Sequence, residues 1–171
     1  MTRTDVPSGA RADEAVGLRA GAARHALLPL RIFLGVTFVY AGLDKLTDSA
    51  FLSATGDGSI GELMRGVRDT SAIPALVDLA LKAPVGFAVA LAIGELLVGL
   101  GVLAGFLTRI AAVGGALISL SLWLTVSWAV TPYYYGNDLA YLMAWTPLIL
   151  AGAPYLSLDS LIRSRRSRRT A

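Results

Sequence analysis

Cysteine is absent from the 171-residue sequence, and histidine occurs once, as His25. Without thiols the chain forms no disulfide, no thiolate nucleophile, no CxxC redox centre and no cysteine-held iron–sulfur cluster. One histidine, placed before the first apolar segment, does not supply the two axial ligands of an intramembrane haem. We therefore expect no metal or haem from this chain alone. Any redox chemistry would need an organic cofactor or a partner protein.

Charge is also scarce. Charged residues make up 16% of the chain against 55% apolar residues, and the mean hydropathy is +0.63. This balance indicates an integral membrane protein whose surface contacts lipid. The one dense run of charge is RSRRSRR at 163–169. Such a run can bind nucleic acid, but directly after an apolar segment it is typical of a cytoplasmic anchor at anionic headgroups. We expect no nucleic acid partner.

Four apolar segments each approach the roughly 17–25 residues that a helix needs to cross the hydrocarbon. They are residues 26–43, 84–107, 110–130 and 138–156. They predict an all-α membrane protein, a four-transmembrane-helix bundle over residues 26–160. Residues 1–25 lack the apolar core of a signal peptide, so we interpret them as a disordered cytoplasmic tail, and 161–171 as a basic one.

The positive charges predict the orientation. If the N-terminus is inside, the external side holds four of the fifteen Lys and Arg residues: Lys45, Arg65, Arg68 and Lys82. The other eleven are cytoplasmic: Arg3, Arg11, Arg19, Arg24, Arg31, Arg109 and the five at 163–169. Because positive residues collect on the cytoplasmic side, we expect a multi-pass protein of the plasma membrane with both termini inside.

The long external connection at 46–83 has helical features. Ser59 and Glu62 stand at the spacing of a capping box, which predicts that a helix begins between them within 59–70. Pro74 suits the first turn of a second helix over 73–84. We expect two short amphipathic helices across the outer mouth of the bundle. They form either a lid over a pocket or a plain interfacial cap.

The first segment has one face with small and charged residues. Arg31, Gly35, Phe38, Gly42 and Lys45 are spaced 4, 3, 4 and 3, and therefore share one side of a helix. Glycines let helix backbones approach closely in a membrane, so this side should contact another helix. Arg31, about 7–8 Å deep at 1.5 Å per residue, either points into the bundle or reaches back to the inner headgroups.

Glu95 is the only charged residue in the second apolar segment and lies near its middle, about 18 Å deep. A central carboxylate costs roughly 2.5–3.5 kcal/mol on insertion scales, so it needs partners from other helices. We expect Glu95 either to be ionised against Arg31 or to be protonated and hydrogen-bonded. Ser121 and Thr125 lie at similar depth. Glu95 is then a structural polar clamp or a catalytic proton carrier, with Arg31 as its electrostatic partner.

An outer cluster of polar and aromatic residues joins the third and fourth segments. It contains Tyr133, Tyr134, Tyr135, Asn137 and Asp138, with Lys45 expected on the same side. Asn137 suits the N-cap of the fourth helix, and Asp138 its positive end. The tyrosines form an aromatic belt, or, with Asp138 and Lys45, they surround a flat ligand with polar tips such as a quinone headgroup.

Three stretches resemble the DoxX/DoxD-like membrane proteins: RIFLGVTFVYAGLDKL (31–46), GELLVGLGVLAGFLTRIAAVGG (94–115) and YYYGNDLAYL (133–142). The similarity covers about residues 27–160 and is greatest to the DoxD-type small subunit of thiosulfate:quinone oxidoreductase. Its signature positions are Arg31, Gly35, Gly42, Lys45, Glu95, Gly99, Arg109 and Asp138. The resemblance implies four spans and electron transfer from thiosulfate to a membrane quinone.

Two functions from different classes follow. The first is an integral membrane subunit of a respiratory oxidoreductase, with quinone as cofactor and Glu95 as proton carrier. DoxD works with a second subunit or fused domain, DoxA, so we expect a DoxA-like or other redox protein as partner. The second is a non-catalytic membrane scaffold that recruits or stabilises a soluble redox enzyme. A small transporter is a weaker third reading, since no inverted repeat with broken helices is visible. The oligomeric state stays open, a homo-oligomer included.

Overall fold

The computed structural model describes residues 25–153 and 155–160, and these residues form helices and no strand. The four long helices are α2 (Leu28–Thr47), α5 (Pro84–Ala104), α6 (Thr108–Leu122) and α7 (Asn137–Ala151). The short elements are α3 (Ile60–Arg68), α4 (Pro74–Leu81), the π-helical η1 (Trp123–Ser127) and the 3-10 helix η2 (Tyr133–Tyr135). The all-helical prediction is confirmed. The predicted tails, His25 apart, lie outside the described residues.

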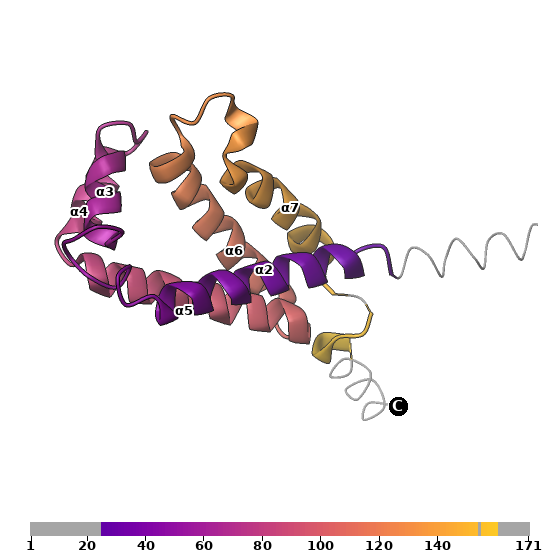
Figure 1. The fold of residues 1–171 in the computed structure, drawn as a ribbon. Coiled ribbons are helices and arrows are strands. Elements are labelled where there is room, and N and C mark those ends of the chain that lie inside the picture. The colour runs from indigo at the N-terminus through magenta and orange to yellow at the C-terminus, as the bar shows by residue number, and fades with distance from the viewer. Residues whose placement is uncertain (1–24, 154, 161–171) are drawn as a thin grey trace, which may run out of the picture.

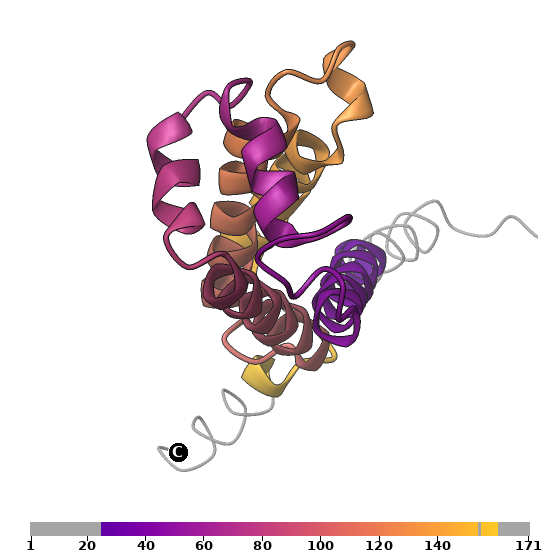
Figure 2. The ribbon, with the colours of Figure 1, turned by 60° about the vertical axis from the view of Figure 1, so that its left-hand side comes forward.

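The long helices form two pairs. α2 lies along α5, α6 lies along α7, and the contact of α5 with α6 joins the pairs (Figure 1). α3 and α4 stand together at the end of the molecule where α2 finishes and α5 begins (Figure 2). As expected, two short helices therefore cover one end of the bundle.

Two apolar clusters hold these elements together. The larger one lies between the pairs, where Leu34, Val102, Trp145 and Leu148 are all 0% exposed. The smaller one joins the short helices to α5 through Ile60, Met64, Val77, Ala80 and Ala88. The α3–α4 hairpin is thus packed onto the bundle and has a small core of its own.

Capping residues explain the helix boundaries. Ser59 accepts a hydrogen bond from the Glu62 amide at 3.2 Å and Pro74 lies in the first turn of α4, both as predicted. Gly105, with φ of 65°, ends α5 before residue 107. The expected Asn137 cap is wrong. Gly136 is the N-cap of α7 and Asn137 is already helical, while Asp138 does lie in the first turn.

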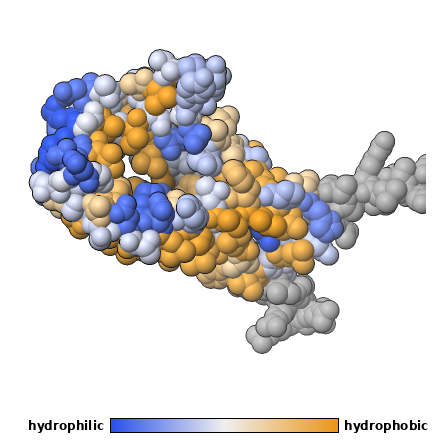
Figure 3. Space-filling model, viewed as in Figure 1, coloured by the Kyte–Doolittle hydropathy of each residue, from blue (hydrophilic) through white to orange (hydrophobic). Residues whose placement is uncertain are grey.

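Two helices of the described residues are long and apolar enough to cross a membrane, Pro84–Ala104 and Thr108–Ser127. α2 has 20 residues but includes Arg31, Asp44 and Lys45. α7 has 15 residues, a length of about 22 Å against a hydrocarbon thickness of about 30 Å. Figure 3 shows a largely apolar face along α2 and α5 and polar residues at the α3–α4 end. The count of four spans stays a prediction.

Candidate functional site

The α2–α5 interface is close because glycines line it. A Cβ on Gly42 would lie 2.6 Å from the carbonyl oxygen of Ala92, and one on Gly99 would lie 2.7 Å from the amide of Val39. The predicted contact face of α2 is therefore confirmed, and α5 is its partner. Since Gly35 faces Gly99 and Gly42 faces Ala92, the two helices run antiparallel.

Glu95 lies in this interface and pairs with Lys45. The Lys45 Nζ donates to Glu95 Oε1 at 3.0 Å and to Oε2 at 2.9 Å, and it also contacts the Ala41 carbonyl oxygen at 3.3 Å. The Glu95 side chain is 4% exposed and that of Lys45 22%. A charge taken out of water needs a counter-charge with good geometry, and this two-oxygen contact supplies one.

The expected pairing of Glu95 with Arg31 is wrong. Side chains lean toward the N-terminus of their own helix. In α2 this direction takes Lys45 toward the level of Glu95 and takes Arg31 away from it. In the antiparallel α5 it takes Glu95 toward the end of α2 that carries Lys45. The direction of the side chains therefore explains why Glu95 pairs with Lys45. An estimate of the depth of each residue in the membrane did not identify this partner.

Arg31 instead fixes the C-terminal segment. Its side chain is buried, as one of the two predictions required, and donates to the carbonyl oxygens of Tyr155 at 3.0 Å and Leu156 at 2.6 Å. Beside it, the carboxylate of Asp159 accepts hydrogen bonds from the amides of Leu107 and Thr108 at 2.9 and 3.0 Å. These contacts lie at the end of the bundle opposite to α3 and α4. Arg31 is therefore separated from Glu95 along the axis of α5.

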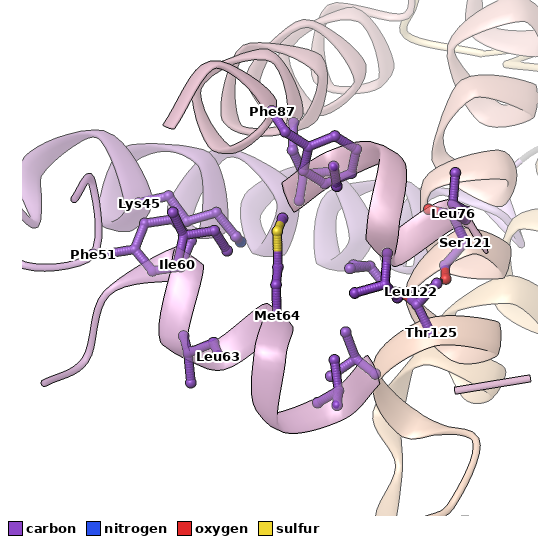
Figure 4. Close-up of a pocket in the computed structure, with 15 residues that line it drawn as sticks. Lys45, Phe51, Ile60, Leu63, Met64, Leu76, Phe87, Ser121, Leu122 and Thr125 are labelled. Carbon is purple, nitrogen blue, oxygen red and sulfur yellow. Dashed lines mark hydrogen bonds between the residues drawn. The ribbon is translucent and has the colours of Figure 1, made fainter. Parts of the chain in front are cut away.

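A cavity of about 270 Å³ lies between the α3–α4 hairpin, α5 and the C-terminal end of α6 with η1. Lys45, Phe51 and Ile60 lie on one side of it and Leu76, Ser121, Leu122 and Thr125 on the other, with Met64 and Phe87 between them (Figure 4). The remaining lining residues are apolar: Leu63, Val67, Val77, Ala80, Leu91 and Val126. The hairpin thus covers a pocket, and Lys45 is the charged residue of its wall.

The π turn of α6 anchors the hairpin. A π turn leaves the regular hydrogen-bond ladder and occurs often at functional sites. Here the carbonyl oxygen of Leu124 accepts from the Ala72 amide at 2.8 Å and from the Ser71 hydroxyl at 3.2 Å. The loop between α3 and α4 is therefore held on the far wall of the cavity.

The three consecutive tyrosines of η2 lie away from the cavity. Tyr133, Tyr134 and Tyr135 are 65–70% exposed, stack edge to face on one another and are not part of the cavity lining. Asp138 is half-buried, accepts a hydrogen bond from Ser127 and interacts electrostatically with Lys45. Of the expected ligand-binding residues, the structure places Lys45 at the cavity, Asp138 outside its lining but in electrostatic interaction with Lys45, and the tyrosines on the surface.

Sequence reasoning missed two features of this site. The Ser71–Leu124 contact joins residues 53 positions apart, and no local sequence pattern predicts it. The Lys45–Glu95 pair did have a signal, because Lys45 belongs to the same α2 face as the glycines. No group of three or more His, Cys, Asp or Glu side chains that could hold a metal ion is found within the described residues.

Comparison with known proteins gives one result. The family model described as DoxX matches residues 26–128. No curated protein and no solved structure matches the chain. The matched residues include Lys45, Glu95 and every residue that lines the cavity, whereas Tyr133–Tyr135 and Asp138 follow the match.

Proposed function

The chain belongs to the DoxX family of membrane proteins, and on that premise we propose that it is an integral membrane subunit of a respiratory oxidoreductase that passes electrons from thiosulfate or a partner enzyme to a membrane quinone. One observation carries the proposal. A partly buried ion pair, Lys45–Glu95, has its lysine in the wall of an apolar cavity, and both residues and the cavity lie within the family match. Intramembrane ionisable residues commonly mark proton relays.

The cavity suits the ring of a quinone. Its volume of about 270 Å³ is close to the lower end of ligand pockets, which range from about 300 to 1,000 Å³. Apolar side chains surround it, and Lys45 Nζ is a donor for a carbonyl oxygen. When bound, a quinone would supply two-electron, two-proton redox chemistry. Lys45 would hold the ring oxygen, and Phe87 and Met64 would pack against its faces.

Lys45 and Glu95 would act together in proton transfer to the quinone. The Lys45 Nζ and Glu95 Oε2 are 2.9 Å apart, within the range for direct proton transfer. A proton leaving Lys45 Nζ would be replaced from outside the pair. Asp138, which interacts electrostatically with both residues, lies at the start of α7 and is only half-buried. It is the route by which Glu95, 3% exposed, exchanges protons with the outer surface.

The electrons come from another protein. The chain contains no cysteine and one histidine, so it offers no ligand set for an iron–sulfur cluster or a bis-histidine haem. We propose a DoxA-like or other soluble redox subunit as the donor. Lipid covers the apolar faces of the bundle, and Lys45, Glu95 and Asp138 act at the quinone.

Reduction of quinone in isolated membranes tests the function. Membranes that carry the chain with a candidate partner should reduce ubiquinone or menaquinone when thiosulfate is added, and Glu95→Gln should lower the rate by about 10²–10⁴-fold, the usual contribution of a general acid–base group. Glu62→Gln, a change of an exposed acid in α3, is the matched control. Absence of thiosulfate-dependent reduction with every partner removes the thiosulfate assignment.

The second candidate function is a non-catalytic scaffold for a soluble redox enzyme. Its support is the completeness of the ion pair: Lys45 Nζ contacts both Glu95 oxygens and the Ala41 carbonyl oxygen, as a purely structural clamp would. A stoichiometric partner recovered equally well with Glu95→Gln, together with unchanged activity of that partner, would favour the scaffold over the catalytic subunit.

A further inference from the structure

The cavity has an opening that its lining residues identify. Two of them are half-exposed, Leu63 in α3 at 51% and Val126 in η1 at 48%. Others are almost fully buried, among them Met64 at 8% and Val77 at 4%. Leu63 and Val126 therefore stand at the mouth and Met64 at the interior. Figure 3 shows apolar side chains in the hollow between α3 and the outer end of α6.

The chemistry of this mouth favours access from lipid. Both mouth residues are aliphatic, and Val126 belongs to the helix Thr108–Ser127, which is long and apolar enough to cross a membrane. A ligand that entered from water would have to pass apolar side chains first. A ligand dissolved in the hydrocarbon meets surroundings like its own.

The interior sets the polarity of the ligand. The Ser121 hydroxyl donates to the Ile118 carbonyl oxygen at 2.8 Å and that of Thr125 to the Ser121 carbonyl oxygen at 2.7 Å, so both hydroxyl protons are used within α6. The Lys45 ammonium has three protons. One shared between the two Glu95 oxygens and one on the Ala41 carbonyl oxygen leave the third for a ligand, so Lys45 is the donor of the lining. Because Glu95 already neutralises it, the site has no net charge to offer an anion, and Glu95 would repel a carboxylate placed at the same ammonium.

We propose that the cavity binds an uncharged, lipid-soluble molecule with a carbonyl oxygen at Lys45 Nζ and an apolar chain that leaves toward the bilayer between Leu63 and Val126. This inference rests on the proposed function and adds the class of ligand and the route of access. The small volume is consistent with it, since a cavity of about 270 Å³ lies just below the usual range of ligand pockets and has room for a headgroup but not for a long chain as well.

Photolabelling of the full chain in lipid nanodiscs tests the proposal. The probe is a benzoquinone with a decyl chain that carries a diazirine, and labelled peptides are mapped by mass spectrometry. Label is expected on α3 and η1, and excess unlabelled decyl-benzoquinone should remove it, whereas dodecanoate at the same concentration should not. Leu63→Trp and Val126→Trp should each lower labelling by at least about tenfold, the smallest effect that one misfitting methylene group has in an apolar pocket.

Leu79→Trp is the matched control. Leu79 is 60% exposed on α4 of the same hairpin but does not line the cavity, so its replacement should leave labelling unchanged. Each variant is first shown to be monodisperse and helical. The proposal is overturned if label maps away from α3 and η1, if dodecanoate competes equally, or if neither mouth variant lowers labelling.

The two proposals can fail separately. If Leu63→Trp and Val126→Trp lower labelling but the chain reduces no quinone with any partner, the ligand class is supported and the oxidoreductase function is removed. Electron transfer to quinone with label mapped elsewhere keeps the function and removes this cavity as its site.

Discussion

At the scale of single residues, the main feature is one charged pair, Lys45–Glu95, in the interface of two apolar helices. Glu95 is expensive to bury, and Lys45 compensates it with both carboxylate oxygens engaged. The geometry follows from the lean of side chains along two antiparallel helices. Lys45 also lines the cavity, so the residue that stabilises the acid is the one that we propose to contact a ligand.

Removal of either partner should destabilise the bundle. Breaking one side of a buried pair costs about 3–5 kcal/mol, and the partial exposure of Lys45 places the expected loss for Lys45→Met and for Glu95→Gln near the lower end. Thermal unfolding in detergent measures the two variants and their combination. The double variant should lose less than the sum of the singles, and strict additivity would show that the residues do not interact.

Two glycines give a matched comparison. Gly42→Ala should destabilise the protein by about 1–3 kcal/mol, because its Cβ would lie 2.6 Å from a backbone oxygen of α5. Gly66→Ala in α3 has no atom within 4 Å of the new Cβ, so it should stabilise by about 0.5–1 kcal/mol. Thermal unfolding of both variants under identical conditions measures the two changes in stability. Equal shifts would contradict the close α2–α5 contact.

The role of an individual residue could be predicted where a local sequence pattern indicated its contact. The spacing of Gly35 and Gly42 indicated the contact face, and the position of Glu95 indicated that it needed a partner. The identity of that partner depended on helix direction as well as depth. Arg31 was misassigned because its true acceptors, the carbonyl oxygens of Tyr155 and Leu156, are backbone atoms in a segment after α7 that has no periodic pattern.

At the scale of elements, the α3–α4 hairpin is the part that defines the cavity. It is held to η1 through Ser71 and internally by Arg68, which contacts the two carboxylate oxygens of Asp78 at 2.5 and 2.9 Å. Hydrogen bonds from Arg68 lower the pKa of Asp78 from its usual value. This contact lies outside the long helices.

The hairpin should loosen in acid. Because the pKa of Asp78 is lowered in the folded state, its contribution is fully present above the ordinary aspartate pKa of about 3.9 and is lost as the pH falls through the lowered value. Hydrogen-exchange protection of α3 and α4 should therefore drop in that range. Asp78→Asn should remove the pH step, and Asp57→Asn, in the preceding loop, should keep it. A step that survives in Asp78→Asn would contradict the assignment.

Elements were predictable when caps and periodicity agreed. Ser59 and Pro74 marked α3 and α4 from the sequence alone. The π turn was not predictable, because Trp123–Ser127 reads as a plain continuation of an apolar helix. The early end of α7 at Ala151 depends on the backbone at Gly152, which the hydropathy of 138–156 did not reveal.

At the scale of the whole molecule, the question is how the chain crosses the membrane. Two helices satisfy length and composition, and α2 packs against the first of them and α7 against the second. We expect all four to span, with α3 and α4 lying across the outer mouth at the membrane surface and both termini inside. Sequence reasoning predicted the membrane class from composition, but the number of spans depends on how lipid adapts to short or charged helices.

Cysteine labelling tests the topology without background, because the chain has no cysteine. In intact cells, Asp57→Cys and Tyr134→Cys should react with an impermeant maleimide from outside, since both positions are exposed at the α3–α4 and η2 end. Phe106→Cys, exposed between α5 and α6, should react after the membrane is opened. Labelling of Phe106→Cys in intact cells would overturn the orientation.

The central claim is that Lys45 and Glu95 form a working pair at a ligand-binding cavity. The most direct measurement is quinone reduction by membranes with the partner enzyme present, compared for the unaltered chain, Lys45→Met, Glu95→Gln and Glu62→Gln. The account predicts that both pair variants lose activity while still assembling with the partner, and that Glu62→Gln retains it. Full activity in a folded, assembled Glu95→Gln protein would contradict the claim.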